Sequence, residues 1–423
     1  MSIAMLITMC LGFALSISIA VSIGLAALLG TWLSNVNMLL SVKEIYTAIN
    51  KFPLAAIPFF ILAGNIMESG GISRRLVEFA KSVVGGVQGG LSATCVLTCM
   101  IFAAVSGSSV ATTFAIGSIL VPALVRHGYP VNYAAALQAT SAELGVVIPP
   151  SIPMIIFGVS AEVSIGELFI AGIGPGILIA GGLISFVLIY ALIKGYGKQD
   201  REGRLPLLTA TRQAMFALFM PVIVLGGIYG GVFTPTEASV AAVFYALLVG
   251  MVVYREIGLK DLGLILRKSV ISSSVILFII ANAGLFSYLI TRAGVPDQIG
   301  EFLRANLGTP FMFLLGVNTA LFFIGMFIET SAAIIVLAPI LVPVAAGFGI
   351  DPVHLGVIVV VNLALGMITP PFGVNLFAAC AVAKISVDQI ILRLVPFVLV
   401  VLVCLMIITY IPPISLFLRD LMY

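Results

Sequence analysis

Two segments inside apolar stretches of the chain combine a glycine, a Pro-Pro step and small polar residues. They are Gly145 to Ser151 and Gly366 to Pro371. Proline has no N–H and obstructs the carbonyl one turn earlier, so backbone carbonyls before each Pro-Pro step lose helical partners. Carbonyl oxygens that gather with hydroxyl oxygens suit a hard cation and need no fixed carboxylate. The two segments therefore predict cation sites.

Small polar residues also interrupt two long apolar runs, 91–126 and 310–346. The interruptions are Ser-Gly-Ser-Ser at 106–109 and Glu-Thr-Ser at 329–331. The half from 91 to 106 would reach only about 24 Å as a helix, which is short for a crossing of ~30 Å. We therefore expect two re-entrant hairpins with polar tips at membrane depth.

In each half of the chain, one hairpin tip and one helix break, meaning the segment with the Pro-Pro step, together predict a Na⁺ site. An alternative is that Pro-Pro merely kinks two helices and that small polar residues ease helix packing. The internal duplication described below favours the ion sites. The expected ligands are carbonyls near Gly145 to Val147 and Gly366 to Ile368, with the hydroxyls of Ser106, Ser108, Thr330 and Thr369.

An anionic substrate is expected between the two hairpin tips, because the helix that begins after each tip presents free N–H groups to it. Helix capping is the alternative role for each polar side chain in this region. The candidate substrate-binding residues are Ser108, Ser109, Ser151, Thr330, Ser331 and Asn375.

The two halves of the chain match without a gap at an offset of 221 residues. Pro149-Pro150 pairs with Pro370-Pro371, Pro122 with Pro343, and Gly128 with Gly349. Leucine matches would mean little in an apolar chain, but Pro-Pro steps in one register are difficult to obtain by chance. The chain therefore contains an internal repeat.

Charge indicates that the two copies are inverted. Segment 72–82 carries three basic residues and one acidic residue, whereas its counterpart 295–305 carries two acidic residues and one basic residue. The basic segment 194–212 predicts a cytoplasmic linker by the positive-inside rule. Tracing the spans from this linker places the N-terminus in the cytoplasm and the C-terminus outside. Inverted repeats with broken helices are typical of secondary transporters.

Composition sets the class of protein. Of 423 residues, 61% are hydrophobic and only 9% are charged, and the mean hydropathy is +1.25. A soluble domain has about a quarter charged residues, so a soluble enzyme, a disulfide scaffold and a disordered chain are excluded. The net charge of +3 does not suggest nucleic-acid binding. We predict an all-α polytopic protein in the lipid bilayer, with full spans at 3–33, 53–68, 168–193, 213–230, 237–253, 270–290 and 390–418 and broken helices at 131–160 and 353–383.

Three acidic residues lie in apolar surroundings, where a charge is costly and a functional role is the usual reason for it. Glu237 follows Thr234 by three residues, as in a helix N-cap, and a structural role is favoured. Glu143 has Ala364 as its counterpart, which argues against a shared ion ligand. Glu329 lies beside a tip, and its role stays open.

The sequence resembles the large membrane subunit of the tripartite ATP-independent periplasmic (TRAP) transporters. The matching stretches are Pro58 to Gly64, Gly107 to Thr112, Gly230 to Ala238 and Gly366 to Asn375. The family's Na⁺ ligands, carried over by the resemblance, fall on Ser106, Ser108, Gly145, Ile148 and Pro150 and on Gly325, Thr330, Gly366 and Thr369. Ile148 lies opposite Thr369, so the first site would use a carbonyl where the second can add a hydroxyl.

The resemblance implies Na⁺-coupled import of an organic acid, of the C4-dicarboxylate or sialic acid class, across the bacterial inner (cytoplasmic) membrane. It also implies a periplasmic substrate-binding protein and a small four-helix membrane subunit. A separate chain is expected for the latter, because no such segment precedes Met1.

An elevator mechanism is implied as well, in which hairpins and broken helices move against a fixed scaffold. The expected scaffold parts are 1–90 and 213–309, each with an amphipathic arm helix. The expected transport parts are 91–193 and 310–423, joined through the linker 194–212.

Other functions stay open at this point. A stand-alone divalent-anion/Na⁺ symporter would need no binding protein. A channel is disfavoured because the breaks are paired and no ring-forming filter motif is present. A membrane enzyme is disfavoured because the sequence offers no nucleophile–base or metal-ligand set at membrane depth.

Overall fold

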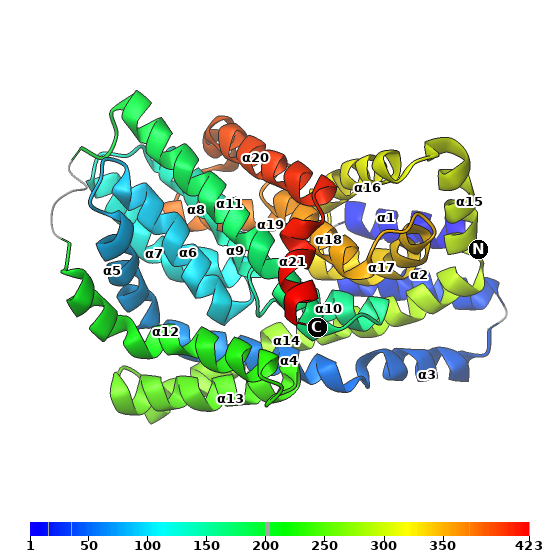
Figure 1. Cartoon of the computed structure of the whole chain (residues 1–423). Helices are drawn as coiled ribbons and strands as arrows, with labels where there is room; N and C mark the ends of the chain where they lie inside the picture. The colour runs from blue at the N-terminus through cyan, green and yellow to red at the C-terminus, as the bar shows by residue number, and fades with distance from the viewer. Residues whose placement is uncertain (16, 35, 199–203, 372, 423) are drawn as a thin grey trace.

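The computed structural model is helical throughout the part of the chain that it describes, residues 1–15, 17–34, 36–198, 204–371 and 373–422 (Figure 1). The first half contains α1 (Ser2–Ala14), α2 (Ile19–Leu33), α3 (Met38–Ile49), the 3-10 turn η1 (Phe52–Ala55), α4 (Ala56–Ser69), α5 (Ile72–Val84), α6 (Gly90–Ser106), α7 (Ser109–Arg126), α8 (Val131–Ala142), α9 (Leu144–Val147), α10 (Ile152–Ala161) and α11 (Ile165–Lys194). The second half contains α12 (Leu207–Tyr229), α13 (Pro235–Leu247), the π-helical turn η2 (Leu248–Val253), α14 (Leu259–Arg292), α15 (Val295–Leu307), α16 (Pro310–Gly325), α17 (Thr330–Ala346), α18 (Pro352–Met367), α19 (Val374–Ala383), α20 (Val387–Tyr410) and α21 (Pro413–Met422).

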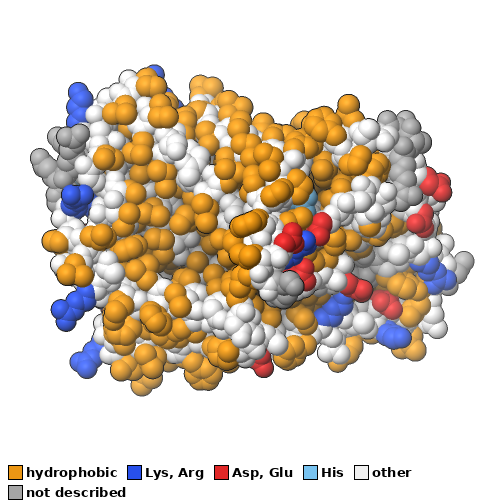
Figure 2. Space-filling view, in the orientation of Figure 1, with side chains coloured by type: hydrophobic (Ala, Val, Ile, Leu, Met, Phe, Trp, Pro, Cys, Tyr) orange, Lys and Arg blue, Asp and Glu red, His pale blue; other side chains and the backbone are white. Residues whose placement is uncertain are grey.

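The predicted class of an all-α polytopic membrane protein is confirmed. Seven helices in the described residues are long and apolar enough to cross a membrane, and one bent pair adds an eighth. That pair is Val131–Val147 with Ile152–Ala161, bent by 42° at the first Pro-Pro step. Hydrophobic side chains are spread over the whole visible face of the molecule, and the visible charged side chains lie towards its two ends and in one cluster between them (Figure 2).

The two halves repeat one order of elements: an amphipathic arm helix, a helical hairpin, a broken helix and a long helix. The arms α5 and α15 lie at opposite ends of the molecule (Figure 1). The hairpins are α6–α7 and α16–α17, and the breaks separate α8–α9 from α10 and α18 from α19. Both Pro-Pro bonds, Pro149-Pro150 and Pro370-Pro371, are cis.

The prediction of a single span at 3–33 is wrong. Helices α1 and α2 form an antiparallel pair, in which Gly12 approaches the Ser22 side chain and Gly30 approaches Met5. The connection at Leu15 to Ser18 contains no charge, proline or glycine, so hydropathy alone does not reveal the turn. In the order of elements, α1 and α2 correspond to α12 and α13 of the second half.

The split changes the expected topology. The N-terminus lies at the end of the molecule that carries α15, whereas the end of α11 and the start of α12 lie at the opposite end (Figure 1). The count of spans predicted the N-terminus and the linker both on the cytoplasmic side, and the division of residues 3–33 into two helices removes the basis for that prediction. The side of the membrane on which each terminus lies stays a prediction. The helices extend into the predicted linker 194–212, because α11 ends at Lys194 and α12 begins at Leu207; residues 199–203 of the linker lie outside the described part.

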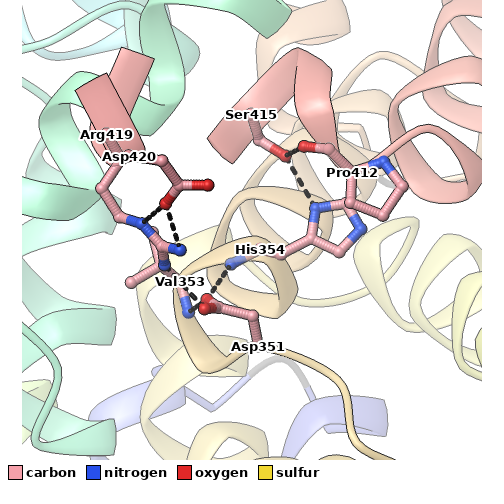
Figure 3. Close-up of polar contacts among 7 residues, drawn as sticks. All are labelled: Asp351, Val353, His354, Pro412, Ser415, Arg419 and Asp420. Atoms are coloured by element: carbon pink, nitrogen blue, oxygen red, sulfur yellow. Dashed lines mark hydrogen bonds and ion pairs between the residues drawn. The ribbon is translucent and has the colours of Figure 1, made fainter. Parts of the chain in front are cut away.

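The span predicted at 390–418 is confirmed as α20, but it ends earlier than predicted, because α20 ends at Tyr410 and a separate helix, α21, begins at Pro413. Helix α21 packs against α11 and reaches the start of α18. There Arg419 forms an ion pair of 2.6 Å with Asp351, and Nδ1 of His354 lies 2.7 Å from the Ser415 hydroxyl (Figure 3). These polar contacts hold the C-terminal helix across both repeats.

The helices form two layers (Figure 1). Helices α2, α3, α4, α12, α13 and α14 pack mainly on one another, and helices α6 to α11 pack with α16 to α20. The arm α5 and helix α14 contact both groups. This grouping parallels the predicted scaffold and transport parts, whose relative motion stays a prediction.

Candidate functional site

The first hairpin tip and the first break lie against each other. Helix α6 ends at Ser106, the chain turns at Gly107 with φ of 62°, and Ser108 caps α7. A Cβ atom at Gly145 would lie 2.8 Å from the carbonyl oxygen of Ser108. A Cβ atom at Gly107 would lie 2.8 Å from the carbonyl oxygen of Pro150. The predicted ligands Ser106, Ser108, Gly145 and Pro150 are therefore brought together.

Oxygen atoms converge at this tip. The Ser106 and Thr112 hydroxyls lie 3.0 Å apart, and Thr112 donates to the Ser108 carbonyl at 2.8 Å. Pro149 has no N–H to donate to the Gly145 carbonyl, so this oxygen lacks its usual helical partner. Thr112 is not among the ligands predicted from the sequence, although its position one helical turn after Ser108 places it on the same helix face.

Ile148 leaves the helical conformation, with φ of −82° and ψ of 129°. Its N–H still donates to the Leu144 carbonyl at 2.9 Å, and its side chain packs beside Gly176 of α11. The extended conformation follows from the proline after it, which disfavours the helical region for the preceding residue.

The second hairpin tip and the second break also meet. A Cβ atom at Gly325 would lie 3.1 Å from the Cα atom of Gly366, so the two backbones touch where α16 ends beside α18. Thr330 donates to the sulfur of Met367 at 2.9 Å, and the Thr369 hydroxyl donates to the Leu365 carbonyl at 2.8 Å. All four predicted residues of the second site lie at this junction of α16, α17 and α18.

One detail of the prediction is wrong at the second break. The Gly366 carbonyl was expected to lose its helical partner, but it accepts from the Thr369 N–H at 2.9 Å. The helix tightens by one residue before Pro370, as the ends of helices commonly do. A carbonyl oxygen has a second lone pair, so this bond leaves room for another partner.

Most candidate substrate residues are engaged in capping or in other internal hydrogen bonds. Ser151 accepts from the Met154 N–H at 3.3 Å and donates to the Val146 carbonyl, and Ser108 accepts weakly from the Ala111 N–H at 3.4 Å. The Ser109 hydroxyl is buried and has no hydrogen-bond partner among the described residues. Capping, the alternative considered from the sequence, is therefore what Ser151 and Ser108 do in this conformation.

Glu329 is the N-cap of α17. Its carboxylate accepts from the N–H groups of Ser331 at 2.9 Å and Ala332 at 3.2 Å, and from the Ser331 hydroxyl at 2.9 Å. Acceptors at this position satisfy N–H groups that have no helical partner. The acid and Ser331 thus fix the start of the helix that follows the second tip.

Glu237 has the structural role that its spacing from Thr234 predicts. The two residues form a capping box at the start of α13, in which the Glu237 carboxylate accepts from the Thr234 N–H at 2.8 Å.

Glu143 and Asn375 connect the two repeats. Nδ2 of Asn375, in α19, donates to Oε1 of Glu143 at 2.7 Å and to the Ala139 carbonyl at 3.1 Å. The Thr113 hydroxyl of α7 donates to Oδ1 of Asn375. Both side chains are buried, and Oε2 of Glu143 makes no hydrogen bond within the described part. The sequence singled out both residues but could not pair them, because they are 232 positions apart.

Two cavities lie between the layers and share Lys51 and Val159. One, of about 210 Å³, is lined by α3, α10, α14 and α17. The other, of about 600 Å³, extends to the start of α13. Lys51 donates to the Val159 carbonyl at 3.2 Å. None of the predicted site residues lines these two cavities, so both tips are closed to them in this conformation.

The comparison with protein families identifies the chain. The family described as "Tripartite ATP-independent periplasmic transporter, DctM component" matches residues 3–414. The chain belongs to this family. The large permease protein DctM of a C4-dicarboxylate TRAP transporter from Pseudomonas aeruginosa is 44% identical over 375 residues, which cover 88% of this chain and 87% of that protein. The resemblance inferred from the sequence is thereby confirmed, and the family consists of transporter components rather than enzymes.

A second TRAP relative differs in its length. The isethionate TRAP transporter permease protein DctMQ from Oleidesulfovibrio alaskensis is 41% identical over 403 residues, which cover 95% of this chain but 64% of that protein. Among solved structures, the YdaH transporter of Alcanivorax borkumensis superposes with a TM-score of 0.64 at 16% identity, over 87% of this chain and 86% of that one. This TRAP large subunit therefore shares its fold with YdaH.

Proposed function

We propose that this TRAP large subunit couples the import of an organic acid to the entry of Na⁺ down its gradient. The observation that carries the proposal is the duplicated meeting of a polar hairpin tip with a proline-broken helix. In each copy a glycine backbone contact brings tip and break together, at Gly145 with Ser108 and at Gly325 with Gly366. Both places are rich in carbonyl and hydroxyl oxygens, which are the ligands that hard cations take.

The first Na⁺ site is assigned to Ser106, Ser108, Gly145, Ile148 and Pro150. The second is assigned to Gly325, Thr330, Gly366 and Thr369. The Thr112 hydroxyl, which lies 3.0 Å from that of Ser106, is an additional candidate for the first site.

A C4-dicarboxylate is the favoured substrate class, because the Pseudomonas aeruginosa relative that carries this name is 44% identical over most of both chains. The sialic acid class is the second candidate. The substrate would lie between the tips, near Ser109, Ser151, Ser331 and Asn375, where the N-terminus of α7 favours a carboxylate. At α17 the Glu329 carboxylate already accepts from the first N–H groups, so a substrate carboxylate would have to displace it there.

Two protein partners follow from the tripartite family. A periplasmic binding protein would deliver the acid, and a small four-helix subunit would complete the membrane part. The longer relative named DctMQ is consistent with a second membrane component next to the large subunit. In the elevator mechanism, the layer of α6 to α11 and α16 to α20 would move against the layer of α2, α3, α4 and α12 to α14 and carry the substrate across the membrane.

The orientation follows from charge. We place the basic linker after α11 in the cytoplasm of a bacterial inner membrane. The N-terminus then lies on the periplasmic side, because it is at the end opposite the linker (Figure 1). With the linker in the cytoplasm, the crossings from α12 to α20 support a periplasmic C-terminus as well.

The decisive experiment is uptake of a labelled C4-dicarboxylate into proteoliposomes under an imposed Na⁺ gradient. The chain is reconstituted with its small subunit, with and without the binding protein. Uptake that needs both Na⁺ and the binding protein supports the proposal. Uptake by the single chain alone supports the stand-alone symporter, which is the second candidate. Flux that does not saturate would instead support a channel.

A further inference from the structure

A cavity of about 680 Å³ opens between the arm helix α5 and the start of α12. Arg74, Arg75 and Arg212 line it, together with Glu78, Phe216 and Tyr254. It lies at the end of the molecule next to the basic linker, where Leu205 also borders it. We propose that this cavity binds a phosphate group, namely the headgroup of an anionic lipid in the leaflet on the linker side.

One arginine is fixed as a wall of the cavity. Arg75 forms an ion pair of 2.6 Å with Glu256, and its guanidinium lies 3.7 Å from the ring centroid of Tyr254. Tyr254 is held in turn by Phe216, which packs edge-on against it, and by its hydroxyl, which donates to the Gln213 carbonyl at 3.1 Å. A stacked guanidinium of this kind is oriented before any ligand arrives.

The other two arginines are available for a ligand. Arg74 and Arg212 are exposed, and neither forms an ion pair with a carboxylate within the described residues. With Arg75 neutralised by Glu256, these two cations and Glu78 leave a net positive charge in the cavity. Guanidinium groups bind phosphate oxygens through paired N–H donors, and Arg is the residue best suited to this geometry.

The apolar surface of α12 next to the cavity favours a lipid as the ligand. Met215, Phe219 and Val222 follow Arg212 by three, seven and ten residues, so all four side chains share one face of α12. The three apolar side chains are 46%, 53% and 58% exposed. Arg212 therefore stands at the head of an apolar stripe. A lipid whose phosphate entered the cavity would lay its acyl chains along this stripe, as basic pockets at the membrane interface commonly allow.

The opposite end of the molecule has the contrary charge. The arm helix α15 lines a smaller cavity of about 130 Å³ with Asp297 and Glu301. If the arm helices only had to be polar to lie at the membrane surface, acidic and basic side chains would serve equally well. The arginines on α5 and α12 are therefore specific to the end where the linker lies.

The test measures lipid binding to the purified full-length chain by native mass spectrometry and by the thermal unfolding midpoint. The probes are dioleoyl phosphatidylglycerol, dioleoyl phosphatidylcholine and inorganic phosphate. The variant is Arg74→Gln with Arg212→Gln. The matched control is Lys260→Gln with Arg267→Gln, two exposed cations that do not line the cavity.

We expect phosphatidylglycerol to bind and to raise the unfolding midpoint, and phosphatidylcholine to do so much less. Loss of two basic side chains near an anionic headgroup should weaken phosphatidylglycerol binding about 30-fold, whereas the control should keep wild-type binding. If millimolar inorganic phosphate displaces the lipid, the same arginines bind a soluble phosphate compound, and the assignment to lipid is overturned. Equal phosphatidylglycerol binding by wild type and the Arg74/Arg212 variant would overturn the site itself.

Discussion

The Asn375 amide of the second repeat donates to the Glu143 carboxylate of the first repeat at 2.7 Å, inside the layer that contains both hairpins. Glu143 lies two residues before Gly145 of the first predicted Na⁺ site, and Asn375 follows the second Pro-Pro break. The contact therefore joins the two predicted sites through buried side chains. A buried polar pair of this kind is costly to break on one side only.

Replacement of Asn375 by Asp should be more harmful than replacement by Ala. Asn375→Ala leaves the Glu143 carboxylate, the Ala139 carbonyl and the Thr113 hydroxyl without this partner, which costs about 1–3 kcal/mol. Asn375→Asp adds a second carboxylate next to Glu143. The unfolding midpoint in detergent measures both effects, and uptake measures their consequence for transport.

The double variant Asn375→Asp with Glu143→Gln should recover part of the loss, because the new amide at position 143 can donate to the new carboxylate at position 375. The Ala139 carbonyl still loses its donor, so recovery should not be complete. The coupling energy follows from the thermodynamic cycle of the two single variants and the double variant. A double variant no more stable than Asn375→Asp alone would show that the two side chains do not act as a pair.

The sequence revealed the parts of the site that repeat. The Pro-Pro steps, their glycines and the polar tips stand at one offset in both halves, so their meeting could be expected without coordinates. The contact of Glu143 with Asn375 has no counterpart in the other half and joins residues far apart in sequence. Only the packing of α19 against α7 and α8 brings this pair together.

The number of crossings was harder to predict than the meeting of the hairpin tips with the broken helices. Residues 3–33 contain no charged residue, and no proline or glycine marks the boundary between α1 and α2. Hydropathy measures burial and not direction, so a continuous apolar run and an antiparallel pair of short helices give the same signal. The error removed the basis for placing the N-terminus in the cytoplasm but left the order of the hairpins intact.

A methyl group at Gly145 should disrupt the first tip. Gly145→Ala would place Cβ 2.8 Å from the Ser108 carbonyl oxygen and from Thr112 Oγ1, so the tip must move away from the break. We expect the Na⁺ concentration for half-maximal uptake to rise about tenfold or more, as displacement of a carbonyl ligand costs at least ~1–2 kcal/mol. Gly226→Ala on α12 is the control, since its Cβ would meet no atom within 4 Å. Unchanged Na⁺ dependence in Gly145→Ala would contradict the first site.

Hydroxyl ligands are tested separately at Ser108 and Thr369. Ser108→Ala and Thr369→Ala should each raise the half-maximal Na⁺ concentration about tenfold, with a smaller effect on expression. Thr369→Ser retains the hydroxyl and should restore wild-type Na⁺ dependence. Thr211→Ala serves as the control, because Thr211 makes the same 2.8 Å bond to its own helix as Thr369 but lies outside both sites. Wild-type Na⁺ affinity in both alanine variants would refute the assignment.

The ion pair of Asp351 with Arg419 should make stability depend on pH below neutrality (Figure 3). Burial raises the pKa of Asp351, but the hydrogen bonds from Arg419 and from the His354 and Val353 N–H groups outweigh it, and the pKa lies below its ordinary value. A carboxyl group with a lowered pKa stabilises the folded chain above its ordinary pKa, near 3.9. This contribution is lost as the pH falls through the lower folded-state value.

Asp351→Asn isolates the charge, because Asn caps a helix about as well as Asp does. We expect the variant to be about 0.5–1 kcal/mol less stable at pH 7, with a smaller decrease on acidification than the wild type. Asp351→Ala also removes the cap of α18 and should cost about 1 kcal/mol more. The measurement is the unfolding midpoint in detergent between pH 3 and pH 7. Parallel pH profiles for wild type and Asp351→Asn would exclude Asp351 as the group that titrates.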